Sequence, residues 1–330
     1  MATLTKGKPH KSDEEFYDER IRFFLENGSI FQKICPTCVD EYNDHSLLKL
    51  ISIMYWIGIF SPIVHRQLRD NFDYRIAYVD SMAGSGVTMA KRANDYFCGS
   101  CPGALLSAIK HNCPFDLMIA VEIKPEKADA LKQRINTITP QPNITVHTKD
   151  ILEISQDIAQ ELQKRTISYI VIDPQALKGM TWAGIGPLLK CKGDAMVTWF
   201  EAEAWRLRRA ASSPKEHQAA EASKERLTEL LGEEWKNVQS AEGLTDLFIK
   251  RVIHECGKTA YAQVKIPRLD GGYYWMILFT GMPKNPQKLV DEWKTNVDRR
   301  INSVYGRGIP SLLDVKAGRI STLKNWIKTE

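Results

Sequence analysis

Short apolar segments alternate with amphipathic segments through the middle of the chain. Arg75–Asp80, Leu117–Val121 and Tyr169–Asp173 are rich in β-branched and aromatic residues, and an acidic residue ends or directly follows each of them. Strands that are apolar on both faces are typical of a parallel sheet covered by helices. The pattern therefore predicts an α/β fold with alternating strands and helices. The other expected elements are strands at Ile144–Val146 and Ala195–Phe200 and helices at Gly103–Lys110, Pro125–Asn136, Ile151–Lys164 and Trp182–Leu189.

The alternation changes after the fifth expected strand. Glu201–Leu231 is charged with helical periodicity, and Thr245–Cys256 predicts another helix. Two further strands follow at Tyr261–Ile266 and Tyr273–Thr280. Leu269–Gly272 joins them with the Asp-Gly chemistry of a hairpin turn. An antiparallel pair is therefore expected to complete the parallel sheet.

The N-terminal region predicts two helices. Ser12 and Glu15 fit a capping box, so a helix is expected from there to about Gly28. Ser46 is the expected cap of a long apolar helix that runs to about Leu68. The uncharged part, Leu50–Val64, has about 15 residues, fewer than the roughly 20 that a bilayer requires. A buried helix is the expected structure.

Composition sets the class of protein. The chain has 330 residues, a net charge of +5 and a pI near 8.7, which permits a nucleic-acid partner without requiring one. Seven cysteines without an export signal predict a cytoplasmic, reducing environment and no membrane association. The expected organisation is an N-terminal tail, helix and cysteine knuckle at 1–45, a sheet domain at 46–283 with a helical insertion at about 201–256, and a basic helical appendage at 284–330.

The first expected strand runs into a glycine turn. Asp80 and Ser81 end the strand, and Gly84 and Gly86 follow at a spacing of two. Glycines let the backbone turn sharply and approach a ligand where any Cβ would collide. A strand, a glycine turn and a helix N-terminus form the nucleotide-cofactor cradle of open α/β sheets. The long interval from Gly86 to the next strand indicates an insertion.

Four acidic residues come at the ends of four successive strands: Asp80, Glu122, Asp150 and Asp173. Ligands of open α/β sheets bind at this carboxyl edge. Each residue has a role if the ligand is S-adenosylmethionine. Asp80 and the glycine backbone would face the methionine part. Glu122 would accept from the ribose hydroxyls, with Ile123 against the adenine, and Asp150 would accept from the adenine amine, with Ile151 beside it. The alternative is that polar residues simply end strands.

Asp173 and Pro174 are the candidate catalytic residues. Asp-Pro after a fourth strand begins the D-P-P-Y type of loop of methyltransferases that act on exocyclic amines. A carboxylate and a fixed main-chain carbonyl that accept the two amine hydrogens localise the nitrogen lone pair for attack on a methyl group. Gln175 and Ala176 replace the second proline and the aromatic residue, which removes the usual stacking surface for a flipped base.

With these residues in view, the chain resembles the three-Cys-motif partner protein family of class I S-adenosylmethionine-dependent methyltransferases. The resemblance covers about Leu47 to Lys294, and its largest departure is Gln175 where the family has Phe. It implies a Rossmann-like class I methyltransferase sheet, parallel with a C-terminal antiparallel hairpin strand, with an N-terminal helical extension and C-terminal helices. It also implies a small cysteine-motif partner protein. The matching segments are Tyr78–Gly86, Gly99–Ala104, Ile172–Gly179, Leu231–Trp235 and Tyr273-Tyr274.

Two C-x-x-C pairs, Cys35/Cys38 and Cys98/Cys101, are outside that resemblance. Paired thiolates at this spacing are the usual halves of a tetrahedral zinc site, so a structural zinc on all four is expected, with His45 as a substitute ligand. Free buried thiols, a redox pair and iron–sulfur ligation are the alternatives.

The preferred function is S-adenosylmethionine-dependent methyl transfer to an amine of RNA or DNA. A basic run follows the fifth strand and suits phosphate contacts, although a solvated helix face explains it equally well. A non-catalytic cofactor-binding module that holds a nucleic acid or protein is one alternative, and a small-molecule methyltransferase, left open by Gln175, is another. The basic residues are Arg206, Arg208, Arg209 and Lys215.

Overall fold

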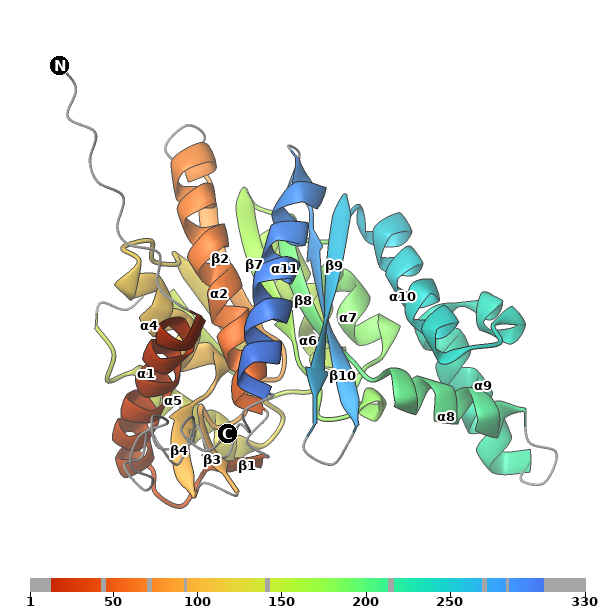
Figure 1. The fold of residues 1–330 in the computed structure, drawn as a ribbon, viewed down its shortest axis with the longest axis horizontal. Coiled ribbons are helices and arrows are strands. Elements are labelled where there is room, and N and C mark those ends of the chain that lie inside the picture. Colours follow the sequence, from red (N-terminus) through yellow and green to blue (C-terminus); the bar gives the residue numbers. More distant parts are fainter. Residues whose placement is uncertain are drawn as a thin grey trace, which may run out of the picture.

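The protein is built around a seven-stranded sheet. The computed structural model describes residues 13–42, 46–69, 73–91, 94–139, 143–212, 217–268, 272–282 and 285–305. The strands of the sheet are β2 (Arg75–Asp80), β5 (Leu117–Val121), β6 (Asn143–His147), β7 (Thr166–Ile172), β8 (Gly193–Trp199), β9 (Ala260–Pro267) and β10 (Tyr273–Thr280). Their order is β6-β5-β2-β7-β8-β10-β9 (Figure 1). The strands from β6 to β8 are mutually parallel, whereas β10 is antiparallel to both β8 and β9.

The central strands are buried on both faces, as their apolar sequences predict. Every residue from Ile76 to Val79 in β2 and from Leu117 to Val121 in β5 is at most 1% exposed. Helices therefore cover both faces of the sheet. In Figure 1, α2 (Ser46–Val64) and α11 (Pro286–Tyr305) lie in front of the sheet, and α6 (Ile151–Leu162) and α7 (Trp182–Leu189) lie behind it. The mixed α/β fold with a mostly parallel sheet is confirmed.

The remaining helices lie around this frame. Three of them, α8, α9 and α10, lie between β8 and β9 in the sequence. They extend beyond one edge of the sheet (Figure 1). Their bounds and those of the other helices are α1 (Asp13–Ile34), α4 (Ser100–Lys110), α5 (Pro125–Ile135), α8 (Glu201–Ala211), α9 (His217–Leu231) and α10 (Ala241–Cys256), with 3-10 turns at Leu177–Gly179 and Glu233–Asn237 and a π-helical turn at His65–Arg69.

The apolar helix α2 lies inside the protein. Among the described residues, Ser46–Gln67 alone is long and apolar enough to cross a membrane, but 67% of its most apolar window is buried by the rest of the fold. Trp56 is fully buried, donates from Nε1 to Asp194 Oδ2 at 3.0 Å, and packs edge-on against Trp293 of α11. The helix is apolar because it forms the centre of one layer.

The predicted end of α1 near Gly28 is wrong, because the helix continues to Ile34. Gly28 faces β4 (Asp95–Cys98), and a Cβ at this position would lie 2.3 Å from Cα of Phe97. Glycine here permits close packing of a helix on a strand and does not terminate the helix.

A small second sheet follows the glycine turn. Its strands are β1 (Asp40–Tyr42), β3 (Val87–Ala90) and β4, with β1 parallel to β3 and β3 antiparallel to β4. The sequence indicated an insertion here but did not predict its strands β3 and β4. Because the Gly99 N–H donates to the Gly86 carbonyl at 2.8 Å, α4 begins beside the turn despite the intervening hairpin.

Some sequence predictions fall outside the described residues. These are the N-terminal tail, the tip of the hairpin between β9 and β10 at 269–271, and the end of the C-terminal appendage at 306–330. The described part of the appendage is α11, which packs against β9 and β10.

Replacement of Gly28 by alanine is expected to lower the free energy of unfolding. Alanine favours a helix by about 1 kcal/mol over glycine, but the new methyl group would overlap the backbone of β4, and overpacking costs about 1–3 kcal/mol or more. Urea denaturation measures the change. Gly179→Ala is the control, because its nearest neighbour would be Cβ of Pro174 at 3.6 Å. An unchanged or raised stability of Gly28→Ala would contradict this packing.

Candidate functional site

The four predicted acidic residues lie along one edge of the sheet. Asp150, Glu122, Asp80 and Asp173 end or follow β6, β5, β2 and β7, which are neighbours in that order. Parallel strands bring their carboxyl ends together, so residues that are far apart in the sequence share one surface. This arrangement was predicted from the sequence, whereas the contacts of each residue were not.

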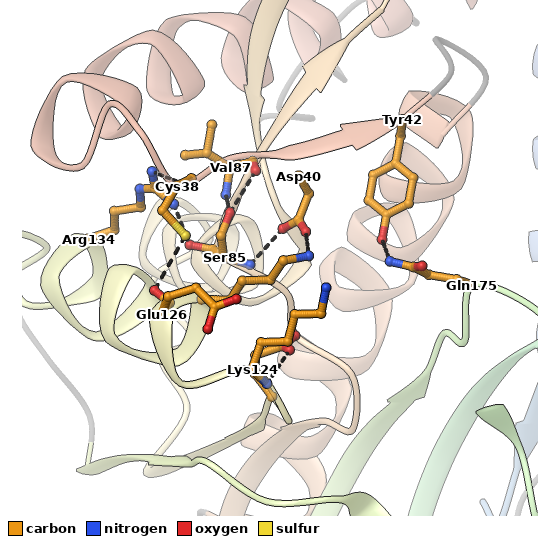
Figure 2. Close-up of polar contacts among 11 residues, drawn as sticks. Cys38, Asp40, Tyr42, Ser85, Val87, Lys124, Glu126, Arg134 and Gln175 are labelled. Atoms are coloured by element: carbon orange, nitrogen blue, oxygen red, sulfur yellow. Dashed lines mark hydrogen bonds and ion pairs between the residues drawn. The ribbon is translucent and has the colours of Figure 1, made fainter.

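The glycine turn is occupied by a carboxylate of the protein itself. Gly84 and Gly86 have φ of +63° and +84°, in the left-handed region that favours glycine. The Ser85 N–H between them donates to Asp40 Oδ2 at 2.7 Å, and Asp40 forms an ion pair with Lys127 (Figure 2). A Cβ on Gly84 would lie 2.6 Å from Asp40 Oδ2. The close approach that requires glycine at this position is therefore that of Asp40.

Arg134 holds the N-terminal segment against this turn. Its guanidinium is buried and donates to the carbonyls of Phe31, Cys35 and Cys38 at the end of α1 and just beyond it, and to the carbonyl of Ser85 at 2.6 Å. Burial lowers the pKa of Arg134, and nearby Cys35, Cys38 and Asp40 oppose that shift. The carbonyl dipoles at a helix C-terminus stabilise the charge. One side chain thereby connects α1, α5 and the glycine turn.

Asp80 and Ser81 are buried beneath the turn. Asp80 is 0% exposed and accepts from the Tyr78 hydroxyl at 3.3 Å and the Met82 N–H at 3.4 Å. The pKa of Asp80 is raised to about 6, chiefly by burial; a hydrogen bond from Ser100 opposes the shift, and the nearby charge of Asp173 adds to it. Ser81 donates both its N–H and its hydroxyl to the Val171 carbonyl at 3.0 Å. The carboxylate at the glycine turn is therefore Asp40 and not the predicted Asp80.

The edge near β5 and β6 is open to solvent. Glu122 Oε1 accepts from the Lys124 N–H at 2.9 Å, and Asp150 Oδ1 accepts from the Leu152 N–H at 2.9 Å as the cap of α6. Ile123 is 58% exposed and Leu152 is 51% exposed. Ile151, predicted beside the adenine, is instead buried. The two acidic residues support local turns, and two apolar side chains beside them face solvent.

Asp173 is held by a lysine and a threonine. Lys49 Nζ of α2 lies 2.6 Å from Asp173 Oδ2, and Thr198 of β8 donates to Oδ1 at 2.7 Å. Both partners of the ion pair are 14% exposed. Each carboxylate oxygen keeps a further acceptor site, so Asp173 can still receive a hydrogen bond. Lys49 was not predicted as a site residue, although it is the one charged residue of α2.

The aromatic ring of Tyr42, in β1, lies beside the Asp-Pro loop. Gln175 Nε2 donates to the Tyr42 hydroxyl at 2.8 Å (Figure 2), and Lys49 Nζ lies 5.8 Å from the ring centroid of Tyr42 and 5.9 Å from that of Tyr274. Burial raises the pKa of Tyr42. The aromatic surface that is absent at Gln175 in sequence is therefore supplied from the N-terminal segment.

A small cavity lies between β1 and the sheet edge among the described residues. Its volume is about 40 Å³, and Asp40, Tyr42, Lys49, Gly84 and Asp173 are among its lining residues. Pockets for cofactor-sized molecules have about 300–1,000 Å³. The N-terminal segment therefore closes this part of the edge in the conformation described.

The structure does not support the predicted four-cysteine zinc site, because no group of three or more metal-ligating residues occurs among the described residues. Cys98 and Cys101 are fully buried, and burial raises the pKa of both thiols. Cys38 Sγ donates to the Glu126 carbonyl at 3.4 Å (Figure 2), and burial raises its pKa as well. One pair is core and the other forms the turn after α1. His45 lies outside the described residues.

Comparisons with known proteins give distant similarities. No family model and no curated protein matches the chain. A Legionella pneumophila protein of the DUF519 family-model is 10% identical, covers 76% of this chain and 92% of its own, and has a TM-score of 0.43. A possible exported protein of Bordetella parapertussis is 13% identical, covers 69% of this chain and 68% of its own, and has a TM-score of 0.36. The StiE O-methyltransferase domain is 11% identical over 73% and 80%, with a TM-score of 0.28. These scores carry no functional argument, and nothing in them supports the three-Cys-motif partner family.

Asp80 is expected to make stability depend on pH. Its pKa is 3.8 when unfolded and about 6 when folded, so the folded state binds more protons between these values, and stability is lost as pH rises through about 6. A shift of this size corresponds to about 3 kcal/mol. Asp80→Asn should reduce the fall in melting temperature between pH 4.5 and 7.5. Asp194, whose pKa burial also raises to about 6, contributes a similar dependence that remains in the variant. Equal pH profiles of wild type and variant would contradict the assignment.

Proposed function

We propose that this protein is an S-adenosylmethionine-dependent methyltransferase that acts on an amine of a nucleic acid. The observation that carries the proposal is the sheet order, with β10 antiparallel between β8 and β9. This ending is the arrangement of class I methyltransferases, whereas Rossmann dehydrogenases complete a parallel sheet. The glycine turn after the central strand β2 and the acidic residues at neighbouring strand ends support the same function.

The open edge fits the adenosine part of the cofactor. Ile123 and Leu152 offer exposed apolar surface for the adenine, and Glu122 follows the strand next to the glycine turn, where carboxylate oxygens can accept from ribose hydroxyls. Asp150 lies one strand farther along and can accept from the adenine amine. The cofactor, when bound, supplies a methyl group on a positively charged sulfur.

The glycine turn fits the amino-acid part only after a local change. Its Ser85 N–H is a donor for a carboxylate, and Asp40 already occupies it. Lys127, the second partner of Asp40, is the nearby cation that an incoming carboxylate would also meet. Binding therefore requires the Asp40 carboxylate to leave the Ser85 N–H.

Asp173 and Pro174 are the residues proposed to carry out the amine chemistry. Asp173 accepts one hydrogen of the acceptor amine, and the Pro174 carbonyl accepts the other, so the nitrogen lone pair is localised before it attacks. Lys49 and Thr198 fix the carboxylate in one orientation, which reduces the reorganisation that the reaction requires. Tyr42 adds an aromatic ring near the ion pair, which favours a planar acceptor.

A non-catalytic binding module is the second candidate. The observation that favours it is the 40 Å³ cavity, which leaves no space for a cofactor while β1 is in place. Methyl transfer from labelled cofactor to total cellular RNA, DNA or protein separates the two functions.

Asp173→Ala is expected to reduce methyl transfer by roughly 10²–10⁴-fold, because alanine leaves no side-chain acceptor for the amine hydrogen. Cofactor affinity should stay nearly unchanged. Single-turnover transfer to the labelled nucleic-acid fraction gives the rate, and titration calorimetry gives the affinity. Asp129→Ala, at an exposed carboxylate of α5, is the matched control. Transfer by Asp173→Ala at the wild-type rate would mean that Asp-Pro is only a turn.

Asp40→Ala is expected to raise the affinity for S-adenosylmethionine, by about tenfold if one charge-assisted hydrogen bond is released. The substitution frees the Ser85 N–H and the Lys127 ammonium for the carboxylate of the ligand. Glu41→Ala removes the neighbouring, half-exposed carboxylate and should leave affinity unchanged. Titration calorimetry measures both variants. A weaker affinity of Asp40→Ala would instead place Asp40 among the groups that hold the ligand.

A further inference from the structure

A second, larger cavity lies between α8 and α9. Its volume is about 510 Å³, within the range of sites that bind small molecules or single nucleotides. The apolar part of its lining includes Leu177, Leu207 and Ala210. Three cationic residues, Lys178, Arg206 and Arg226, line the same cavity. An apolar surface next to several cations is suited to a ligand that joins a flat apolar group to a negative charge.

The cationic character of this cleft is not cancelled by its one acidic residue. Glu203 Oε2 accepts from the Leu177 N–H at 2.8 Å, and Oε1 lies 3.8 Å from Arg206. Arg226 donates to the Leu177 carbonyl at 2.8 Å, while its Nε is buried without a hydrogen-bond partner among the described residues. Lys178 is exposed, and the Arg206 side chain is 73% exposed. The lining therefore carries a surplus of positive charge that faces solvent.

The cleft adjoins the candidate catalytic loop. Leu177 and Lys178 follow Asp173 by four and five residues, in the 3-10 turn that continues the Asp-Pro loop. A nucleic-acid strand with one base at Asp173 would therefore bring its next phosphates to the α8–α9 cleft. The chain thus offers two neighbouring sites with different chemistry, one for an amine and one for a phosphate.

The structure divides the predicted basic run. Arg206 lines the cleft, whereas Arg208 lies over the Trp235 ring at 5.5 Å and donates to the Lys236 carbonyl. Arg209 is exposed but outside the cleft lining, and Lys215 lies outside the described residues. Lys178 and Arg226, from other segments, take their place in the cluster. Charge on α8 alone therefore does not define the binding surface.

We propose that the α8–α9 cleft binds the sugar-phosphate backbone and one unpaired base of a single-stranded nucleic acid beside the acceptor nucleotide. The inference rests on the proposed function, because that function supplies the acceptor at Asp173. A single strand is favoured because the cleft has the volume of one nucleotide and an apolar lining for a base. The cations bind phosphate irrespective of sequence.

The experiment measures binding of a fluorescein-labelled, mixed-sequence 12-nucleotide RNA to the full chain by fluorescence anisotropy. The variant Lys178→Glu/Arg206→Glu is expected to bind at least tenfold more weakly at low salt. Its log–log salt slope should be smaller by about 1.4, because each lost phosphate contact on a single strand contributes about 0.7. Both side chains are exposed, so the variant should fold like the wild type.

Three further variants separate the cleft from general charge. Arg206→Glu and Arg209→Glu each reverse one charge on α8, but Arg209 lies outside the cleft lining, so Arg209→Glu should alter affinity by less than threefold. Ala210→Trp fills the cleft without changing charge, and should weaken binding at least fivefold. Equal effects of Arg206→Glu and Arg209→Glu, or wild-type affinity of Ala210→Trp, would overturn the proposal. Stronger competition by poly-glutamate or AMP than by unlabelled RNA would overturn it too.

Cofactor calorimetry distinguishes this inference from the proposed function. The charge-reversal variant should retain wild-type affinity for S-adenosylmethionine, because its changes lie away from the glycine turn. If the protein binds no cofactor but its RNA affinity depends on the cleft, the proposed nucleic-acid site is supported and the proposed methyltransferase function is contradicted. If the protein binds the cofactor and transfers methyl groups but its RNA affinity does not depend on the cleft, the methyltransferase function is supported and the proposed nucleic-acid site is contradicted.

Discussion

A buried arginine whose hydrogen bonds within the described residues all go to backbone carbonyls determines how the N-terminal part meets the sheet. Arg134 gives its hydrogen bonds to carbonyl oxygens, three at or just beyond the end of α1 and one in the glycine turn. Removing any of these carbonyls would leave a buried charge poorly solvated, at a cost of several kcal/mol. The end of α1 and the glycine turn are consequently held at a fixed separation. The position of β1, and with it Asp40 and Tyr42, depends on this contact.

This constraint gives the candidate site two unlike halves. Toward β6 the edge is open, with exposed apolar side chains beside Glu122 and Asp150. Toward β7 it is covered by β1, and the glycine turn holds a carboxylate of the same chain. A carboxylate at this turn satisfies the same donors that a ligand would use, so the closed conformation is stable without a ligand. The strand that closes the site, β1, also carries Tyr42, whose ring lies beside the Lys49–Asp173 ion pair.

Charge changes from negative to positive along the edge. Acidic residues end the strands on the side of the glycine turn, the Lys49–Asp173 pair lies in the middle, and cations line the cleft between α8 and α9. Such a gradient orients a ligand that is positive at one end of the site and negative at the other. The proposed sulfonium cofactor and phosphate-bearing acceptor have these charges, and each would meet the part of the edge that is complementary to it.

The sequence by itself determined the sheet, the strands that carry it and the edge where the acidic residues gather. Those features follow from local periodicity and from the rule that parallel strands share their carboxyl ends. It also located the inserted segment after Gly86, although not as a hairpin. Only the tertiary structure decided what each residue contacts. Gly28 reads as a helix end in sequence, but its neighbour is a strand nearly seventy positions away. The cysteine pairs have metal-site spacing, yet one pair packs in the core, because spacing within a pair says nothing about the distance between pairs. Asp40, Lys49 and Arg134 carry no local signal that identifies their partners, since ion pairs and buried hydrogen bonds join segments whose separation in space is set by the fold.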